Sequence, residues 1–208
     1  MSSNVMTKSG TSSPAKIRMM AQIAMLTAVA EILMLFEIPL PFAPAFYEID
    51  LSEVPILIGC FAMGPLAGAV IETLKILLNF LINGTMTAGV GELANLAIGC
   101  AFVVPAGLIY KYRKCRKNAV IGMTVGTIVM TVIGGFLNAY VLLPAYAAAF
   151  GGMDAIIGMG TAVNGNITGL QSFVLFAVVP FNLVKGIVVS TVTFLLYKHV
   201  SRILIHNL

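Results

Sequence analysis

The chain has 208 residues, of which 59% are hydrophobic and 10% are charged, and its mean hydropathy is +1.00. Soluble domains average about 25% charged residues, so this composition excludes an ordinary soluble protein and predicts a membrane protein made of helices. The formal net charge is +4. At this length we expect one membrane domain of at most about six short spans, without internal repeats.

The chain divides into a polar tail and an apolar remainder. Residues 1–16 are Ser-rich and contain few apolar side chains, so we expect a disordered N-terminal tail. Residues 17–208 then form the membrane-embedded domain. Apolar runs of sufficient length predict an all-α bundle. Its six spans are expected near residues 17–38, 52–63, 65–83, 91–112, 118–146 and 180–201.

The number of spans depends on whether the chain turns at Gly64-Pro65. Pro65 disfavours helical geometry at the residue before it, which argues for a turn. Ten of the twelve Lys and Arg residues lie in the N-terminal tail, in the cluster KYRKCRK (111–117) or near the C-terminus. With six spans these basic regions share the cytoplasmic side with both termini, as the positive-inside rule requires. A five-span topology would put the cluster outside.

Two long segments are expected outside the cell. Residues 37–55 carry four prolines and four acidic residues, which suit either a stiff lid or an ordinary external connector, and composition alone favours the connector. Residues 151–169 are rich in Gly and Asn, and we expect them to be mobile. The stretch LQSFVLFAVV (170–179) is too short to cross a bilayer, so it is predicted as a helix on the outer face, with the last span beginning at Pro180.

Polar side chains in the predicted spans fall at a similar depth, in the outer half of the bundle. A charge within the membrane needs a partner, water or a ligand, so Lys185 in PFNLVKGIVVS indicates a site. The convergence predicts one pocket for a neutral, polar, multi-ring or hydroxylated ligand. The alternative is that Glu72 and Lys75 neutralise each other and that the asparagines join helices. The candidate pocket residues are Asn138, Asn182, Lys185, Asn95, Asn79 and Lys75.

Two further patterns concern partners and chemistry. Ala24 and Ala28 form a small-xxx-small pattern in the first span, which allows close approach of another helix, within this chain or from a partner. No GxxxxGK[ST], HExxH or GxSxG motif occurs in the sequence. We therefore expect neither ATP binding by this chain nor enzymatic activity.

Four segments in order resemble the riboflavin-specific substrate-binding (S) components of energy-coupling factor (ECF) transporters. The resemblance covers most of the chain from Met20 to Arg202. The segments are IDLSEVPILIGCFAMGPLAG (49–68), ETLKILLNFLI (72–82), GELANLAIG (91–99) and PFNLVKGIVVS (180–190).

The resemblance implies six helices and one vitamin held beneath the loop that joins the first two. It implies that Asn138, Asn182 and Lys185 hydrogen-bond the flavin, and that Leu51 and Ser52 add contacts through the backbone. Glu48 departs from the family, in which a basic residue is common at that position.

The resemblance also implies the partners and the transport cycle. The S component binds riboflavin outside the cell, joins a transmembrane coupling protein and two ATPase subunits, and topples to release its cargo inward. Ala24 and Ala28 match the family's docking motif AxxxA. We expect a bacterial plasma-membrane location with lipid around the chain, riboflavin as transported substrate, no cofactor and no nucleic acid. An S component for folate or thiamine, and a purely structural membrane protein, are the alternatives.

Overall fold

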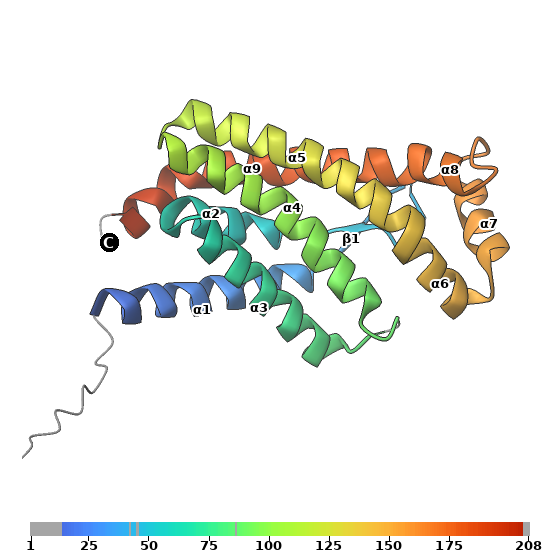
Figure 1. The fold of residues 1–208 in the computed structure, drawn as a ribbon, viewed down its shortest axis with the longest axis horizontal. Helices are drawn as coiled ribbons and strands as arrows, with labels where there is room; N and C mark the ends of the chain where they lie inside the picture. Colours follow the sequence, from blue (N-terminus) through green and yellow to red (C-terminus); the bar gives the residue numbers. More distant parts are fainter. Residues whose placement is uncertain (1–13, 42, 45, 86, 206–208) are drawn as a thin grey trace, which may run out of the picture.

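The computed structural model describes residues 14–41, 43–44, 46–85 and 87–205. Residues 1–13 of the predicted tail lie outside this part of the chain, and the first helix begins at Pro14. The described residues form a helical bundle with one small hairpin of two antiparallel strands (Figure 1).

The bundle contains helices and two π-helical turns, labelled η. In chain order the elements are α1 (Pro14–Met34), β1 (Ile38–Pro39), β2 (Glu48–Ile49), α2 (Glu53–Met63), α3 (Pro65–Asn83), α4 (Val90–Tyr112), α5 (Arg116–Leu137), η1 (Asn138–Leu142), α6 (Leu143–Phe150), α7 (Met153–Val163), α8 (Leu170–Phe173), η2 (Val174–Val178) and α9 (Val179–Ile205).

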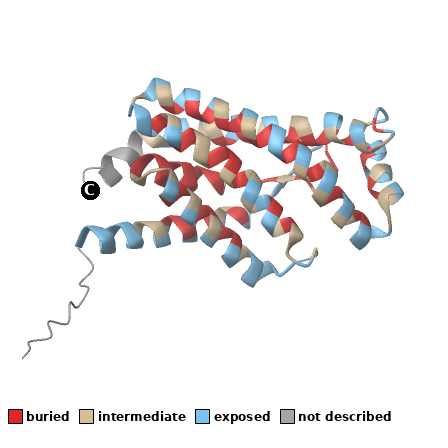
Figure 2. Cartoon of the chain, viewed as in Figure 1, coloured by how far each residue is buried: buried red, intermediate tan, exposed pale blue. Residues whose placement is uncertain are grey.

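Among the described residues, five helices are long and apolar enough to cross a membrane: Pro14–Met34, Pro65–Asn83, Val90–Tyr112, Arg116–Phe150 and Leu170–Tyr197. Helix α2 has only 11 residues, which span about 17 Å. All of its residues except the last are buried inside the bundle. The outer faces of the long helices carry the exposed residues (Figure 2).

The predicted turn between the second and third spans is confirmed. Gly64 separates α2 from α3 with a φ of 105°, a conformation that favours glycine, and Pro65 occupies the first turn of α3. The backbone can therefore reverse direction within one residue.

The last helix begins earlier than the sequence predicts. Residues 170–179 do not form a separate outer helix, because α8, η2 and α9 are continuous from Leu170. Proline lacks an N–H and disturbs the preceding helical turn. The π turn accommodates Pro180, since the Val179 N–H bonds to the Val174 carbonyl five residues back. Another π turn, η1, comes just before Pro144, and it makes α5 and α6 one helix.

Small residues bring α4 and α5 close together. A Cβ at Gly122 would lie 2.7 Å from the Ala106 carbonyl oxygen, and a Cβ at Gly126 would overlap the backbone of Phe102. Substitution at either glycine would force the two helices apart. The contact holds these long helices side by side, with α9 packed along α5 (Figure 1).

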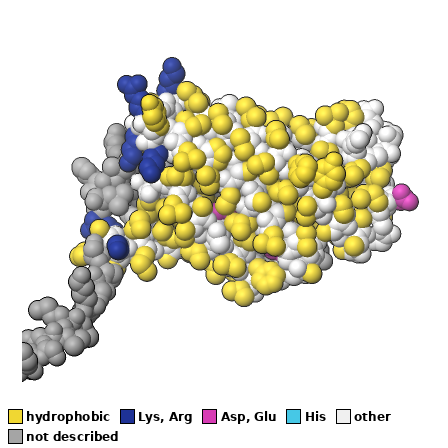
Figure 3. All heavy atoms as spheres, viewed as in Figure 1, with side chains coloured by type: hydrophobic (Ala, Val, Ile, Leu, Met, Phe, Trp, Pro, Cys, Tyr) yellow, Lys and Arg dark blue, Asp and Glu magenta, His cyan; other side chains and the backbone are white. Residues whose placement is uncertain are grey.

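The two ends of the bundle differ in charge and shape. Lys and Arg side chains gather at the end where α1 begins and α4 turns into α5 (Figure 3). At the other end, the β1–β2 hairpin and α7 lie between the ends of the long helices (Figure 1). Residues 153–163 form helix α7 within the segment 151–169, and the mobility expected of this segment stays a prediction.

Candidate ligand-binding site

A cavity of about 630 Å³ lies at the hairpin end of the bundle, within the size range of ligand sites. Its walls come from the ends of α1 and α4, the β1–β2 loop and helix α7. The two helices that contain π turns also contribute, through η1 and α6 and through α9. The lining residues are Met34, Glu37, Phe46, Tyr47, Glu48, Asp50, Asn95, Ile98, Asn138, Leu142, Tyr146, Phe150, Met159, Phe181, Asn182 and Lys185.

Two buried asparagines present amide groups to this cavity from neighbouring helices. Asn138 is the first residue of η1, and its Nδ2 donates to the Gly134 carbonyl at 2.8 Å. Asn182 donates to the Val178 carbonyl at 2.9 Å. No protein hydrogen bond to the Asn182 Oδ1 is found among the described residues. This oxygen remains available as an acceptor.

The buried hydroxyl of Tyr47 fixes the orientation of Asn138. Its O–H donates to Asn138 Oδ1 at 2.5 Å, and burial raises the pKa of Tyr47, so the phenol stays protonated and can serve as the donor. The Tyr47 ring lies 5.0 Å from that of Phe181 and 4.8 Å from that of Phe46. Aromatic groups therefore line one wall of the cavity beside the amides.

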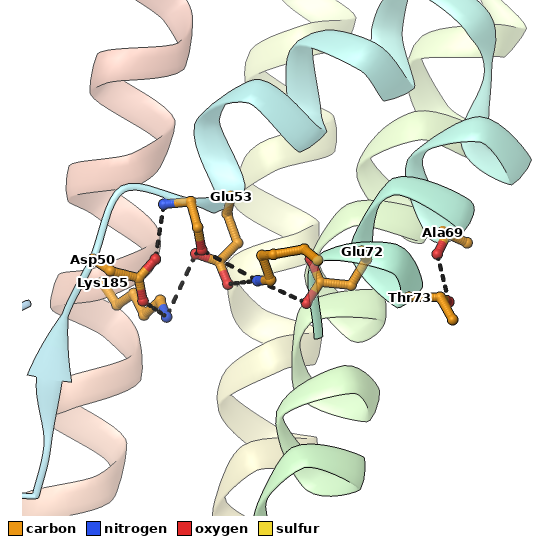
Figure 4. Close-up of polar contacts among 8 residues, drawn as sticks. Asp50, Glu53, Ala69, Glu72, Thr73 and Lys185 are labelled. Carbon is orange, nitrogen blue, oxygen red and sulfur yellow. Dashed lines mark hydrogen bonds and ion pairs between the residues drawn. The ribbon is translucent and has the colours of Figure 1, made fainter. Parts of the chain in front are cut away.

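Lys185 is paired with carboxylates and also lines the cavity. Its Nζ lies 3.1 Å from Asp50 Oδ2 and 3.4 Å from Glu53 Oε2, and 17% of the side chain remains exposed (Figure 4). Burial disfavours ionisation of Asp50, but the ammonium groups of Lys185 and Lys75 outweigh it and lower the pKa of Asp50 below its usual range. The ion pair therefore stays charged, and the partly exposed Lys185 side chain still lines the cavity.

Lys75 occupies a sealed position next to this pair. Its side chain is 2% exposed, and its Nζ lies 3.0 Å from Glu72 and 3.4 Å from Glu53. It also donates to the Ser52 hydroxyl at 3.2 Å. Glu53 connects the two lysines, because each of its carboxylate oxygens contacts one of them (Figure 4). We call Asp50, Glu53, Glu72, Lys75 and Lys185 the ion cluster.

A second hollow of about 460 Å³ adjoins the cavity, and we call it the vestibule. The two share Met34, Glu37, Asn95 and Tyr146. The vestibule is otherwise lined by Leu35, Ile76, Asn79, Asn83, Gly84, Thr87, Gly91 and Glu92. Glu37 and Asn95 are exposed whereas Asn138 and Asn182 are buried, so the shared residues mark the mouth of the cavity.

The structure brings four of the predicted site residues together. Asn95, Asn138, Asn182 and Lys185 line the cavity, and Asn79 lines the vestibule, where its amide also donates to Glu31 at 3.3 Å.

The other three predicted residues lie away from the cavity wall. Lys75 belongs to the ion cluster, and Ser52 contacts it through its hydroxyl. Leu51 is half-buried against the apolar core. The pairing of Lys75 with Glu72 matches the alternative in which these charges neutralise each other. The exposed Ala24 and Ala28 lie on α1, outside the two hollows.

Sequence reasoning missed the aromatic wall and the acid partners of Lys185. Tyr47 and Phe46 belong to a loop with few recognisable patterns, and Asp50 is 135 residues from Lys185 along the chain. The excess of acidic residues in 37–55 was the available signal. A buried lysine requires a counter-charge, and this segment was the place to seek it.

The arrangement favours an uncharged planar ligand with polar edges. Aromatic side chains can pack against a ring, and amides and an ammonium group can meet ring carbonyls and nitrogens. Together, the apolar helices and the polar cavity define a membrane-embedded small-molecule-binding protein.

The chain belongs to the family described as "ECF transporter, substrate-specific component", whose profile matches residues 18–197. This is a family of transporter components and not of enzymes. The chain is 35% identical to the riboflavin transporter RibU of Staphylococcus aureus (strain TCH60), over 88% of this chain and 89% of that protein. It is 32% identical to the riboflavin transporter FmnP of Bacillus subtilis (strain 168), over 88% of this chain and 91% of that protein.

A solved structure described as the S component of a bacterial ECF transporter has the same fold. It aligns with a TM-score of 0.71 at 34% identity, and the match covers 91% of this chain and 98% of that chain.

Proposed function

We propose that this chain is the riboflavin-binding S component of an ECF transporter in a bacterial plasma membrane. The observation that carries the proposal is the convergence of Asn138, Asn182 and Lys185 on one aromatic-walled cavity. Relatives at 35% and 32% identity are named riboflavin transporters, which supports the same ligand. The chain captures riboflavin at the outer face, and an ATPase-driven coupling module completes its delivery inward.

The proposed pose places the flavin ring between the aromatic wall and the two amides. The Asn182 Oδ1 accepts from the ring N–H, and the Lys185 ammonium donates to a ring carbonyl. Asn138 is held in place by Tyr47 and contacts the polar edge of the ring. Asn95 and Asn79 meet the hydroxylated side chain, and Lys75, Leu51 and Ser52 support the site from behind.

The proposed topology has six crossings with both termini in the cytoplasm. Helix α2 completes the second crossing together with the hairpin segment, because its 11 residues are too short alone. The grouping of Lys and Arg at one end supports a cytoplasmic location for that end (Figure 3). The cavity then opens to the outside.

The absorption spectrum of the purified protein tests the ligand. Preparations from riboflavin-containing cells are expected to be yellow, and titration is expected to quench riboflavin fluorescence saturably. Asn182→Leu is expected to weaken binding at least about tenfold. The matched control is Asn118→Leu in the first turn of α5, away from the cavity, and it leaves the affinity unchanged. Saturable binding of thiamine or folate in place of riboflavin would contradict the proposal. The absence of saturable binding of any of these vitamins would also contradict it.

The docking of partners is tested on α1. Ala24 and Ala28 are exposed small residues on one helix face, which suit close approach of a coupling-protein helix. Ala24→Phe with Ala28→Phe is expected to abolish co-purification with the coupling protein and two ATPases while riboflavin binding persists. The control is Val132→Phe on the exposed face of α5. Normal assembly of the α1 variant would reject this docking face.

A further inference from the structure

The mouth of the cavity carries an unbalanced negative charge. The described residues that line the cavity and vestibule include Glu37, Glu48, Asp50 and Glu92 as acids and Lys185 as the one base. Lys185 is already 3.1 Å from Asp50 and 3.4 Å from Glu53. Three carboxylates at the mouth are therefore left without an ion-pair partner among the described residues.

These three carboxylates come from separate elements, and Glu37 at the mouth links Glu48, which lines the cavity, to Glu92, which lines the vestibule. Glu37 follows α1 and lines both hollows. Glu48 lies in β2, and Glu92 lies in the first turn of α4, where it accepts a hydrogen bond from Thr85 at 3.0 Å. Pro39 pairs with Glu48 in the hairpin, so Glu37, two residues earlier, is a diagonal neighbour of Glu48 on the same face.

The remaining polar groups of the vestibule are neutral. Asn79, Asn83, Asn95 and Thr87 supply amide and hydroxyl groups, which can both donate to and accept from the hydroxyls of a sugar-like chain. A phosphate ester would instead bring a charge of about −1.5 to −2 at pH 7. It would face the acidic mouth, and Lys185 could reach it only by leaving its own partners.

We propose that Glu37, Glu48 and Glu92 make the mouth selective for an uncharged, hydroxylated flavin side chain and against its phosphate ester. The inference rests on the proposed function and specifies the chemical form of flavin that the chain accepts. Like-charge juxtaposition at a binding interface is a strong source of discrimination.

The test compares riboflavin with riboflavin 5′-phosphate in fluorescence titrations at pH 8 and low salt. The wild-type protein is expected to bind the phosphate ester at least about tenfold more weakly than riboflavin. Each of Glu37→Gln, Glu48→Gln and Glu92→Gln is expected to narrow this ratio by about threefold to fivefold, as for a partly exposed charge interaction. The triple variant is expected to show the largest change, and higher salt narrows the wild-type ratio because it screens the charges.

Asp154→Asn is the matched control. It removes one negative charge from an exposed position on α7 that lines neither hollow, and it leaves the ratio unchanged. Equal affinity of the wild-type protein for both flavins would overturn the inference. Equal shifts of the affinities for riboflavin and for its phosphate ester in Glu37→Gln, Glu48→Gln and Glu92→Gln would also overturn it. Saturable riboflavin binding in the same preparations shows that the protein is folded, whereas a wild-type protein that binds neither flavin contradicts the proposed function itself.

Discussion

Lys75 and Lys185 lie in the same ion cluster, but their surroundings differ. Lys75 is sealed, with 2% of its side chain exposed and carboxylates from both α2 and α3 around it. Lys185 shares Glu53 with Lys75, but it keeps 17% exposure and lines the cavity. From this comparison we expect the partly open lysine to contact the ligand. We expect the enclosed lysine to act only as a structural ion-pair partner.

The largest expected effect is on stability, at the sealed end of the cluster. Lys75→Met leaves the carboxylates of Glu53 and Glu72 without their shared ammonium group, which costs about 3 to 5 kcal/mol for a broken buried pair. Thermal unfolding in detergent measures the loss. Lys111→Met, at the exposed basic end, is the control and stays close to wild type.

A double substitution keeps this prediction testable if the single variant does not fold. Lys75→Met with Glu72→Met removes a charge pair together, so it is expected to recover at least half of the lost stability. Glu53 then retains Lys185 as its partner. Equal stability of Lys75→Met and Lys111→Met would show that the sealed cluster contributes nothing.

The open end of the cluster is expected to respond in affinity rather than in stability. Lys185→Met is expected to weaken riboflavin binding by about 1.5 to 3 kcal/mol, the range for a hydrogen bond to a charged group. Its melting temperature falls less than that of Lys75→Met, because the cavity lets water reach Asp50. Fluorescence titration and thermal unfolding of the same preparation measure both quantities. Unchanged affinity, or a larger stability loss than in Lys75→Met, would break the distinction between the two lysines.

The sequence predicted the parts of the fold that depend on local pattern. Apolar runs indicated the long helices, and Gly64-Pro65 indicated the turn that the backbone confirms. The start of the last helix was predicted wrongly because Pro180 is a valid first-turn residue as well as a kink residue. Only the π turn that precedes it shows how the helix continues through the proline.

The candidate site could be predicted in part, for a similar reason. Asn138, Asn182 and Lys185 stand out as polar residues in apolar runs, and depth alone brings them together. The partners that orient them are distant in sequence, since Tyr47 lies 91 residues before Asn138. The hairpin that carries Tyr47 and Asp50 has strands of only two residues, too short for any periodic signal.

A smaller effect is expected where an uncharged hydrogen bond orients the site. Tyr47→Phe removes the donor to Asn138 Oδ1 and lowers riboflavin affinity by about 0.5 to 1.5 kcal/mol, because the freed amide must be reoriented. The matched control is Tyr140→Phe, because Tyr140 lies in the same π turn as Asn138 but is exposed. Titration of both variants measures the difference, and equal affinities would remove Tyr47 from the binding apparatus.

The smallest expected effect is a pH dependence at the mouth of the cavity. A hydrogen bond with Glu48, together with burial and the negative charges of Glu48 and Asp50, raises the pKa of Glu37 from 4.5 to about 7, and Lys185 opposes the rise. The hairpin with its strands paired therefore binds this proton more tightly than a hairpin with its strands separated, in which Glu37 would have its ordinary pKa of 4.5. Strand pairing becomes more favourable as the pH falls through 7, and repulsion between the carboxylates returns as the pH rises.

Because residues of the hairpin segment line the cavity, riboflavin affinity is expected to rise on the order of threefold from pH 8 to pH 6. The change is modest because Glu37 is exposed. Glu37→Gln removes the titrating group and is expected to flatten this profile, whereas Asp154→Asn keeps it. Titrations at four pH values between 6 and 8 measure the slope, and riboflavin has no group that ionises in this range. A slope that persists in Glu37→Gln would assign the titration to another group. A flat wild-type profile would mean that the carboxylate pair does not influence ligand binding, and the contrast between the sealed and the open end of the ion cluster would then rest on the lysines alone.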